Sequence, residues 1–320
     1  MKLFYKKDQT LDEVFADPFK LERDMQNLIE NNVSSIFGYL LIASELTVGK
    51  YRIDSLCFDE ENNSFVIIEY KKGSSYSVID QGYTYLQLLL NNKPEFLLAL
   101  SQHFNKVLQI TDVDWSCSRI VFISPSFNSY QKDSVNFKNL PFELWEIKKF
   151  SNDIVILDQH HSTSKESIES ISDPASQGVI SSVSKEIKTV DIEEHFSKSS
   201  DALIEKWHQL QERFAELDDT YLESIPRYIT LNYNKKKICY INPSKDKIRF
   251  DLNRGNIHTD GTKSKNYFSL DDPKDISKEK TWTYKSGQQG GCYNIPFTKD
   301  SDIEYFMFLI KQKYSQIVNQ

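Results

Sequence analysis

The sequence predicts a two-domain α/β protein, in which a mixed sheet flanked by helices is followed by a smaller α+β domain. Three observations lead to this prediction. Up to residue 157 the chain alternates helical and strand patterns in the order helix, hairpin, helix, strand, strand. At 158–199 the periodicity disappears and serine dominates, which indicates a flexible linker, with a short helix at 183–188 as an open alternative. From residue 200 to 320 the pattern returns, and a length of 320 residues suits two domains.

The N-terminal domain, expected over residues 1–157, contains two helical patterns and four strand-like patterns. Apolar residues at helical spacing predict helices at 21–31 and 78–90. Apolar stretches of strand length predict strands at 51–58, 65–71, 119–124 and 142–150. A polar cluster at 59–63 joins the first two strands, so these strands form a predicted hairpin with a solvated acidic tip.

The C-terminal domain, expected over residues 200–320, begins with an amphipathic helix at 202–217. Short strands joined by tight polar turns then predict a meander at 228–233, 237–243 and 247–252. A last strand at 293–297 and a closing helix at 303–317 complete the predicted domain.

Composition points to a cytoplasmic protein without a membrane segment. The apolar runs are far shorter than the ~20 residues that a spanning helix needs. No basic-then-apolar segment opens the chain, so we expect no secretory signal. The four cysteines are widely spaced, which fits neither a disulfide framework nor a paired-cysteine metal site. The net charge of −7 argues mildly against nucleic acid as a partner.

Three charged residues of the predicted hairpin share one face of the sheet. Asp54 lies in the first strand, and Glu69 and Lys71 lie two residues apart in the second. A turn centred on 61–62 sets Asp54 opposite Glu69, and a turn centred on 62–63 sets Asp54 opposite Lys71. Either register brings two carboxylates and one ammonium group within a few ångströms of each other.

Charge appears only at the end of the second strand, after the apolar run 65–68. Two close carboxylates are costly unless a hard divalent cation neutralises them. Mg²⁺ is commonly held by one or two carboxylates, waters and a substrate phosphate, which fits this set. Lys71 would then orient or help deprotonate the attacking water, or hold the phosphate. The alternative interpretation is a solvated Glu–Lys pair on a sheet surface.

The same residues resemble the PD-(D/E)xK nuclease superfamily, in which an acidic residue is followed by E-x-K on the next strand. Asp54 and the run Glu69-Tyr70-Lys71 match that pattern, with Ile53 in place of the proline. The resemblance covers about residues 21–150, with the motifs in the expected order along the chain.

Two further matches lie on the flanking helices. Gln81 and Tyr85 are similar to the Q-x-x-x-Y motif of the RecB-like branch, and Glu22 opens a helix similar to that of RecB-like and NucS-like endonucleases. Each residue also has a simpler interpretation. Gln81 and Tyr85 fit a polar edge and a core aromatic, and Glu22 fits a first-turn acid favoured by the helix dipole.

The resemblance implies a restriction-endonuclease-like fold and metal-dependent hydrolysis of phosphodiester bonds, with DNA as the expected substrate and RNA not excluded. It implies a Mg²⁺ or Mn²⁺ ion held by Asp54, Glu69, the Tyr70 carbonyl and Glu22. It implies that Lys71 serves the nucleophilic water, and that Gln81 and Tyr85 contact the nucleic-acid backbone or support Lys71. The implied biological setting is restriction, anti-phage defence or repair.

The C-terminal domain carries the positive charge of the chain. Residues 200–320 contain 19 basic and 17 acidic residues, whereas both other regions are acidic, so the net charge of the whole chain is a poor guide to its partners. Lys235, Lys236 and Lys237 at a predicted turn, with interleaved tyrosines, would hold phosphates and stack bases. Lysines at sheet edges also serve solubility alone. The domain resembles an α/β domain of unknown function found behind such nucleases in bacteria.

Two other functions stay open at this point. The first is a non-catalytic module, built on a nuclease fold, that binds nucleic acid or a protein in a defence complex. Intact Asp54, Glu69 and Lys71 argue against it. The second is a subunit that is active only with another subunit of a defence system. Formation of a homodimer is equally open.

Overall fold

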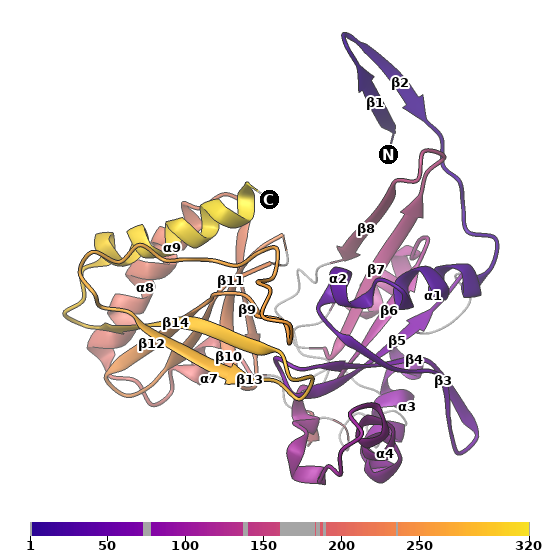
Figure 1. Ribbon diagram of the computed structural model, residues 1–320, viewed down its shortest axis with the longest axis horizontal. Coiled ribbons are helices and arrows are strands. Elements are labelled where there is room, and N and C mark those ends of the chain that lie inside the picture. The colour runs from indigo at the N-terminus through magenta and orange to yellow at the C-terminus, as the bar shows by residue number, and fades with distance from the viewer. Residues whose placement is uncertain are drawn as a thin grey trace. The chain divides into compact units, whose positions relative to one another are not determined.

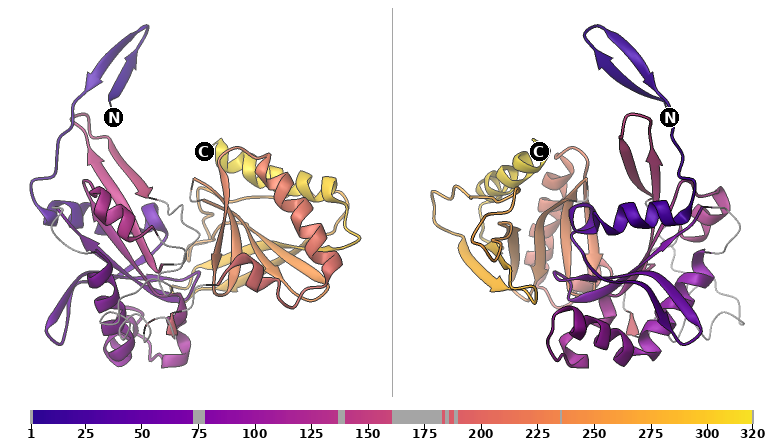
Figure 2. Two further views of the ribbon diagram at one scale, coloured as in Figure 1. Left: turned by 180° about the vertical axis from the view of Figure 1, so that it is seen from behind. Right: turned by 45° about the vertical axis from the view of Figure 1, so that its right-hand side comes forward.

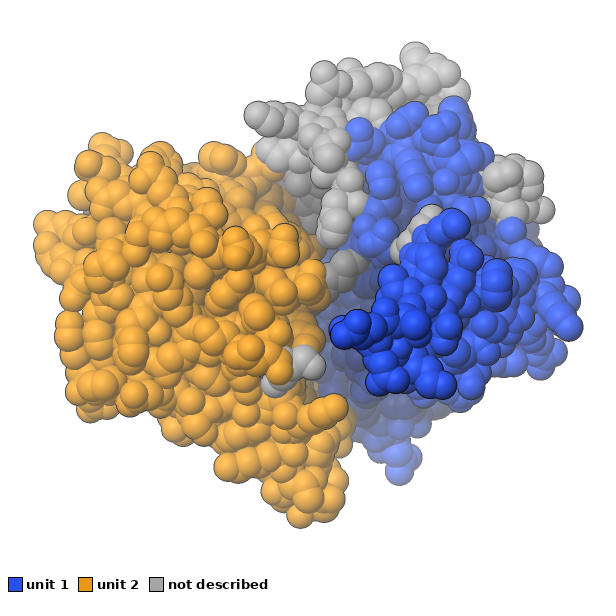
Figure 3. Space-filling view, turned by 90° about the horizontal axis from the view of Figure 1, so that it is seen from above, with its two compact units in different colours: residues 1–188 blue, residues 189–320 orange. Residues whose placement is uncertain are grey.

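The computed structural model describes residues 2–72, 78–136, 140–160, 183, 186–187, 190–234 and 236–319. The chain separates into two compact units, residues 1–188 and 189–320, which are coloured differently in Figure 3. Most of the linker predicted at 158–199 lies outside the described residues. The described parts of that segment include the end of a strand at His160 and two buried side chains, Val183 and Ile187. The predicted domain limits therefore stay a prediction.

The first unit is built on a six-stranded mixed sheet (Figure 1). Its strand order is β3 (Leu40–Val48), β4 (Tyr51–Asp59), β5 (Ser64–Tyr70), β6 (Arg119–Ser124), β7 (Phe142–Lys149) and β8 (Val155–His160). The pairs β5–β6 and β6–β7 are parallel, and the other pairs are antiparallel. The predicted strands at 51–58, 65–71, 119–124 and 142–150 are confirmed to within one residue.

Helices cover both faces of this sheet, as the two views of Figure 2 show. One face packs against α1 (Glu22–Glu30) and α2 (Val33–Phe37) through a core that contains Met25 and Ile29. The other face packs against α3 (Val78–Asn91) and α4 (Lys93–His103) through a larger core. The described part of the unit also contains a short helix, α5 (Ser129–Ser134), and the single turns η1 (Ile110–Asp112) and η2 (Trp115–Cys117). The predicted fold class, a mixed central sheet flanked by helices, is confirmed.

The central strands bury both faces, which explains their continuous apolar sequences. Phe65, Val66, Ile67 and Ile68 of β5 are fully buried. Alternate residues of β5 enter the two cores, so each face of the strand supports a different helix layer.

The helix α3 approaches the sheet closely because it carries a glycine. A Cβ atom at Gly82 would lie 2.6 Å from the ring of Phe142 on β7, so a larger residue cannot fit without a shift. Tyr83 stacks edge-to-face on the same ring, with ring centroids 5.0 Å apart. These contacts fix the position of the helix that presents Gln81 to the end of β5.

Several elements of the first unit were not predicted from the sequence. These are the strands β3 and β8, the helices α2, α4 and α5, and an N-terminal hairpin of β1 (Leu3–Lys7) and β2 (Thr10–Val14). The hairpin is a two-stranded sheet of its own, and its residues are mostly exposed, so its sequence lacks a clean alternation.

The second unit is a six-stranded antiparallel sheet with helices on one face (Figure 1). Its strand order is β13 (Lys278–Thr283), β14 (Gln289–Thr298), β12 (Lys247–Asn253), β11 (Lys236–Pro243), β10 (Tyr228–Tyr233) and β9 (Thr220–Ile225). The helices α8 (Asp201–Ala215) and α9 (Ile303–Val318) form one core with the sheet, and a short helix, α7 (Ile192–His195), precedes them. The predicted meander and both helices are confirmed, whereas β9 and β13 were missed.

No helix in the described part of the chain is long and apolar enough to cross a membrane.

Candidate active site

The β4–β5 hairpin has the first of the two predicted registers. Ser55 pairs with Ile68 and Leu56 with Ile67, so the turn is centred on residues 61–62. The ladder ends at the Ser55–Ile68 pair, and Asp54 and Glu69 are the next residues of the two strands, close enough that, after burial, the charge of Asp54 raises the pKa of Glu69. The amide of Tyr70 donates to Asp54 Oδ2 at 3.0 Å, which fixes the Asp54 carboxylate at the end of β5.

Glu69 is the residue at which the predicted site residues meet. Its side chain is only 5% exposed. Lys71 Nζ lies 2.8 Å from Glu69 Oε1, and Gln81 Nε2 donates to the same oxygen at 2.7 Å. The Tyr85 hydroxyl lies 3.4 Å from it and receives a hydrogen bond from Gln81 at 3.2 Å. The motif residues of β5 and of α3, which are far apart in sequence, therefore converge on one carboxylate oxygen.

The second oxygen of Glu69 has a different environment. Glu69 Oε2 is buried and has no hydrogen-bond partner among the described residues. A buried carboxylate oxygen without a partner is costly, and strain, a catalytic role, a bound water or a bound ion can account for one. This oxygen lies on the carboxylate that faces Asp54 across the hairpin.

Burial and mutual repulsion perturb both carboxyl groups. Burial, and then the charge of Asp54, raise the pKa of Glu69 to about 7. Burial also raises the pKa of Asp54, although the hydrogen bond from the Tyr70 amide and the charge of Lys71 oppose the shift. Ionising both carboxyl groups at once is therefore unfavourable in the absence of a further cation.

Asp54 and Glu69 are the side chains that could hold a divalent cation at this place. An ion that accepts hard oxygen ligands would occupy the position next to Glu69 Oε2, and Mg²⁺ is satisfied by one or two carboxylates when waters complete its shell. In the described residues no three or more His, Cys, Asp or Glu side chains are grouped to hold a metal. Asp54 and Glu69 are therefore the two carboxylates considered as ligands of such an ion.

Glu22 lies close to this pair but contacts a different group. Its Oε1 accepts a hydrogen bond from the Lys72 amide at 2.7 Å, just beyond the end of β5. The charge of Glu22 also contributes to the raised pKa of Asp54, after the larger effect of burial. A direct role of Glu22 in metal binding stays a prediction.

A buried polar network behind the site was missed by sequence reasoning. Gln26 Nε2, on α1, donates to the Asp54 carbonyl at 3.0 Å and to Glu30 Oε1 at 3.0 Å. Ser55 donates to the same Glu30 oxygen at 2.6 Å and lies 3.2 Å from the Tyr70 hydroxyl. The only sequence signal was a polar pair four residues apart, at 26 and 30, on a helix whose neighbours Met25 and Ile29 are fully buried.

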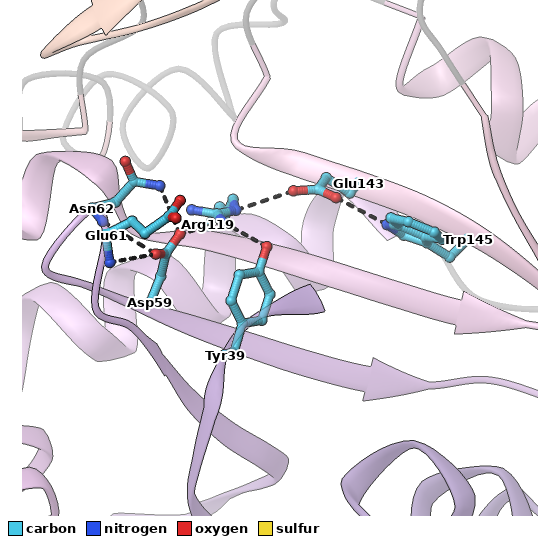
Figure 4. Close-up of polar contacts among 7 residues, drawn as sticks. All are labelled: Tyr39, Asp59, Glu61, Asn62, Arg119, Glu143 and Trp145. Carbon is cyan, nitrogen blue, oxygen red and sulfur yellow. Dashed lines mark hydrogen bonds and ion pairs between the residues drawn. The ribbon is translucent and has the colours of Figure 1, made fainter. Parts of the chain in front are cut away.

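A second charged network lies at the opposite end of the sheet (Figure 4). Arg119 opens β6 and donates to Glu143 at 3.0 Å, to Asp59 at 2.8 Å and to the Tyr39 hydroxyl at 2.6 Å. The Asp59 carboxylate also accepts from both the Asn62 amide and its side chain.

This network corrects one sequence prediction. The acidic tip of the hairpin was expected to be solvated, but Asp59 is only 3% exposed. This burial was not predictable from local pattern, because the arginine that pairs with Asp59 is 60 residues away in the chain.

The basic run of the second unit is only partly described. Lys235 lies outside the described residues, and Lys236 and Lys237 begin β11. Lys237 Nζ lies 5.4 Å from the centre of the Tyr240 ring, a cation–π contact. The hydrogen-bonded group around Glu69 lies wholly in the first unit, so a nucleic-acid role for these lysines stays a prediction.

Sequence comparison with known proteins finds a relative that matches this chain over nearly its full length. An uncharacterized protein of Haemophilus influenzae is 36% identical over 314 residues, which cover 98% of this chain and 99% of that protein. The chain belongs to the same family. No family model matches the chain.

Solved structures give partial similarities at low TM-scores. A repair endonuclease from Pyrococcus abyssi is 20% identical, with a TM-score of 0.21, over 37% of this chain and 44% of its own. EndoMS in complex with double-stranded DNA is 18% identical, with a TM-score of 0.21, over 35% of this chain and 40% of its own. SfsA from Pyrococcus furiosus, in complex with Ca²⁺, is 15% identical, with a TM-score of 0.25, over 49% of this chain and 74% of its own. The match thus spans less than half of each of the first two proteins.

Proposed function

We propose that the protein is a metal-dependent nuclease that hydrolyses phosphodiester bonds, with DNA as its substrate, in restriction, defence or repair. The observation that carries this proposal is the unpartnered buried oxygen of Glu69 beside Asp54. Two carboxylates and an ammonium group at one strand end are the groups that such a reaction needs. Their sequence pattern and their convergence with Gln81 support the same conclusion.

Asp54 and Glu69 would hold the cation, with the Tyr70 carbonyl and Glu22 as further oxygen ligands. When bound, Mg²⁺ or Mn²⁺ supplies charge stabilisation to the phosphate and lowers the pKa of a bound water. The Tyr70 amide holds the Asp54 carboxylate, and the donors on Glu69 Oε1 hold the Glu69 carboxylate. The protein therefore presents both ligands in fixed positions.

Lys71 is the residue that would act on the substrate. Its ammonium group contacts Glu69 Oε1, whereas the proposed ion would lie at Oε2. The Lys71 side chain is 14% exposed. A lysine ammonium at this point can hold a phosphate oxygen or orient the attacking water. Gln81 and Tyr85 have a positioning role, because they restrain the carboxylate that Lys71 contacts.

The test is cleavage of plasmid, linear and single-stranded DNA, and of RNA, with Mg²⁺ or Mn²⁺ and with EDTA. We expect metal-dependent cleavage by the wild type, and a loss of at least about 100-fold in Asp54→Asn and in Lys71→Met. The matched controls are Glu45→Gln and Lys50→Met, two residues that are exposed in the structure. Cleavage at the wild-type rate by both site variants would refute the assignment, and an inactive wild type on every substrate would refute the proposed function.

A further inference from the structure

The strand β4 loses its regular pairing at Asp54, the first of the two proposed metal ligands. The pairing of β3 with β4 includes Ser55 and Ile53 but passes over the residue between them. The pairing of β4 with β5 ends at Ser55. Within the described part of the chain, Asp54 therefore has no strand partner on either side.

The side chains around Asp54 show the same break. Residues two apart in a regular strand face the same side of the sheet. Ile53 belongs to the core beneath α3, whereas Ser55 donates to Glu30 of α1, on the opposite side. The alternation of faces is thus interrupted between Ile53 and Ser55. Local breaks of this kind re-aim a side chain, and they leave the main chain without the support of the sheet.

The side chain of Gln26 supplies a contact at this break. Gln26 lies on α1 and is 7% exposed. Its Nε2 donates to the Asp54 carbonyl at 3.0 Å and to the Ser44 hydroxyl of β3 at 3.2 Å. One buried amide therefore joins β3 and β4 beside the position where their pairing is absent.

The helix α1 fixes the position of this amide. Met25 and Ile29 are fully buried in the core between α1 and the sheet. Glu30, one turn after Gln26, accepts a hydrogen bond from the same amide at 3.0 Å. Glu22, one turn before Gln26, contacts the chain just beyond the end of β5. Positions 22, 26 and 30 thus form one stripe of the helix that contacts the chain at the candidate site.

We propose that Gln26 is a positioning residue of the candidate site. Its amide holds the main chain of Asp54 at the break in β4, so that the Asp54 carboxylate stays where the Tyr70 amide and the cation can reach it. The inference rests on the proposed function for the use of Asp54 as a metal ligand. Gln26 acts through Asp54, as residues do that orient metal ligands from behind, and loss of such a residue commonly weakens metal binding 10- to 100-fold, in order of magnitude about 10-fold or more.

The first test is amide hydrogen exchange of the full chain in EDTA, measured residue by residue by NMR. The Tyr70 amide donates to Asp54 Oδ2 at 3.0 Å, so its protection reports whether the carboxylate stays in place. Gln26→Met keeps the length of the side chain but has no donor, and the Tyr70 amide should then exchange about 10-fold faster. The next amide, that of Lys71, donates to the Ile123 carbonyl of β6 at 2.9 Å and should be unaffected.

The second test is the affinity for Mn²⁺, measured by titration calorimetry without substrate. Gln26→Met should bind Mn²⁺ about 10-fold more weakly than the wild type. Ser44→Ala should change affinity much less, because the Asp54 carbonyl keeps its donor.

The matched control is Gln131→Met. Gln131 is also buried, at 2% exposed, but it accepts a hydrogen bond from the Asn128 amide at the start of α5. Its replacement should leave Tyr70 exchange and Mn²⁺ affinity unchanged, and urea unfolding shows whether each variant is folded. Gln26→Asn, whose amide is one methylene shorter, should reproduce the effects of Gln26→Met and takes its place if that variant is unfolded.

Three results would each overturn the inference. The first is unchanged exchange of the Tyr70 amide or unchanged Mn²⁺ affinity in a folded Gln26 variant. The second is equal acceleration of exchange at Tyr70 and Lys71, which indicates general loosening of the sheet. The third is the same pair of effects in Gln131→Met.

The two proposals fail in different ways. A wild type that binds no Mn²⁺ contradicts the proposed function, whereas the exchange experiment in EDTA still decides whether Gln26 holds Asp54. A wild type that binds Mn²⁺ through Asp54, with exchange and affinity indifferent to Gln26→Met, contradicts the positioning role alone.

Discussion

Glu69 has two oxygens in opposite situations, and this difference defines the candidate site at the residue scale. One oxygen, Oε1, accepts hydrogen bonds from Lys71 and Gln81. The other, Oε2, is buried without a hydrogen-bond partner among the described residues. The charged carboxylate is therefore a source of instability in the metal-free protein. Sites that bind or react commonly carry such a cost, because the geometry that suits the ligand is unfavourable without it.

This cost predicts a dependence of stability on pH. The ordinary pKa of Glu69 is 4.5, and in the folded protein it is about 7. Between these values the unfolded chain releases a proton that the folded chain retains, so the free energy of unfolding falls as the pH rises and levels off above about 7. Glu69→Gln removes this loss and should be more stable than the wild type at pH 8 by about 1–3 kcal/mol, with little difference near pH 4.

Urea unfolding in EDTA at the two pH values measures this difference. Glu45→Gln, an exposed glutamate, is the control and should show no comparable gain. Two results would contradict the electrostatic account. One is a Glu69→Gln protein that is less stable than the wild type at pH 8. The other is an equal change in the free energy of unfolding at both pH values.

The sequence predicted the residues whose spacing encodes their contact. Asp54, Glu69 and Lys71 lie on adjacent strands of a short hairpin, and Gln81 and Tyr85 lie one helical turn apart. The supporting residues Gln26, Glu30 and Ser55 were missed because the contacts that join α1 to β4, from Gln26 to the Asp54 carbonyl and from Ser55 to Glu30, link distant parts of the chain. Long-range polar partners leave no periodic signal in a single sequence.

At the scale of elements, the Arg119 network links the hairpin turn to three strands. Arg119 begins β6, Asp59 ends β4 and Glu143 lies in β7. The side chains are only 20%, 5% and 22% exposed, so their charges are weakly screened. The strand β4, which this network anchors at Asp59, continues at its other end to Asp54 of the candidate site.

Removal of the shared cation should therefore be costly. Arg119→Leu leaves two carboxylates without their common partner and should lower the free energy of unfolding by about 3 kcal/mol or more. The matched control is Arg52→Leu, because Arg52 pairs with Glu45 at 3.4 Å and both side chains are largely exposed. That variant should cost less than about 1 kcal/mol. Equal costs in urea unfolding would show that the buried network contributes nothing beyond a surface pair.

The strands that the sequence missed share a position in the sheets. β3 and β8 are the edges of the first sheet, and β9 and β13 are the edges of the second. Edge strands bury less surface, and β13 is exposed along its whole length. Their hydrophobic patterns are correspondingly weak. The central strands, which are buried on one or both faces, were predicted to within a few residues.

At the scale of the whole molecule, each unit has its own hydrophobic core. Two cores, one on each face of the first sheet, belong to the first unit, and a third belongs to the second unit. The chain predicted as a linker supplies residues to both, since Val183 joins the first unit and Phe196 the second. The sequence revealed the number and class of the units, because local patterning determines these. It did not reveal which residues of the serine-rich segment are buried, because their burial depends on contacts with the two cores.

The net charge of the chain says little about the substrate of the first unit. The proposed chemistry depends on two carboxylates that need a cation, and on Lys71, which contacts one of them. At moderate salt, charges that lie more than about 10 Å from the site are largely screened. Acidic residues elsewhere in the chain therefore have little effect on the electrostatic potential at the site.

The central claim is that Asp54 and Glu69 bind a divalent cation, and a crystal structure of the protein soaked in Mn²⁺ tests it most directly. We predict an anomalous density peak at coordination distance from Asp54 and from Glu69 Oε2, with Lys71 and Gln81 still on Oε1. Crystals of Glu69→Gln in the same solution should lack the peak. A well-ordered wild-type site without manganese density, or a peak that is unchanged in Glu69→Gln, would contradict the account.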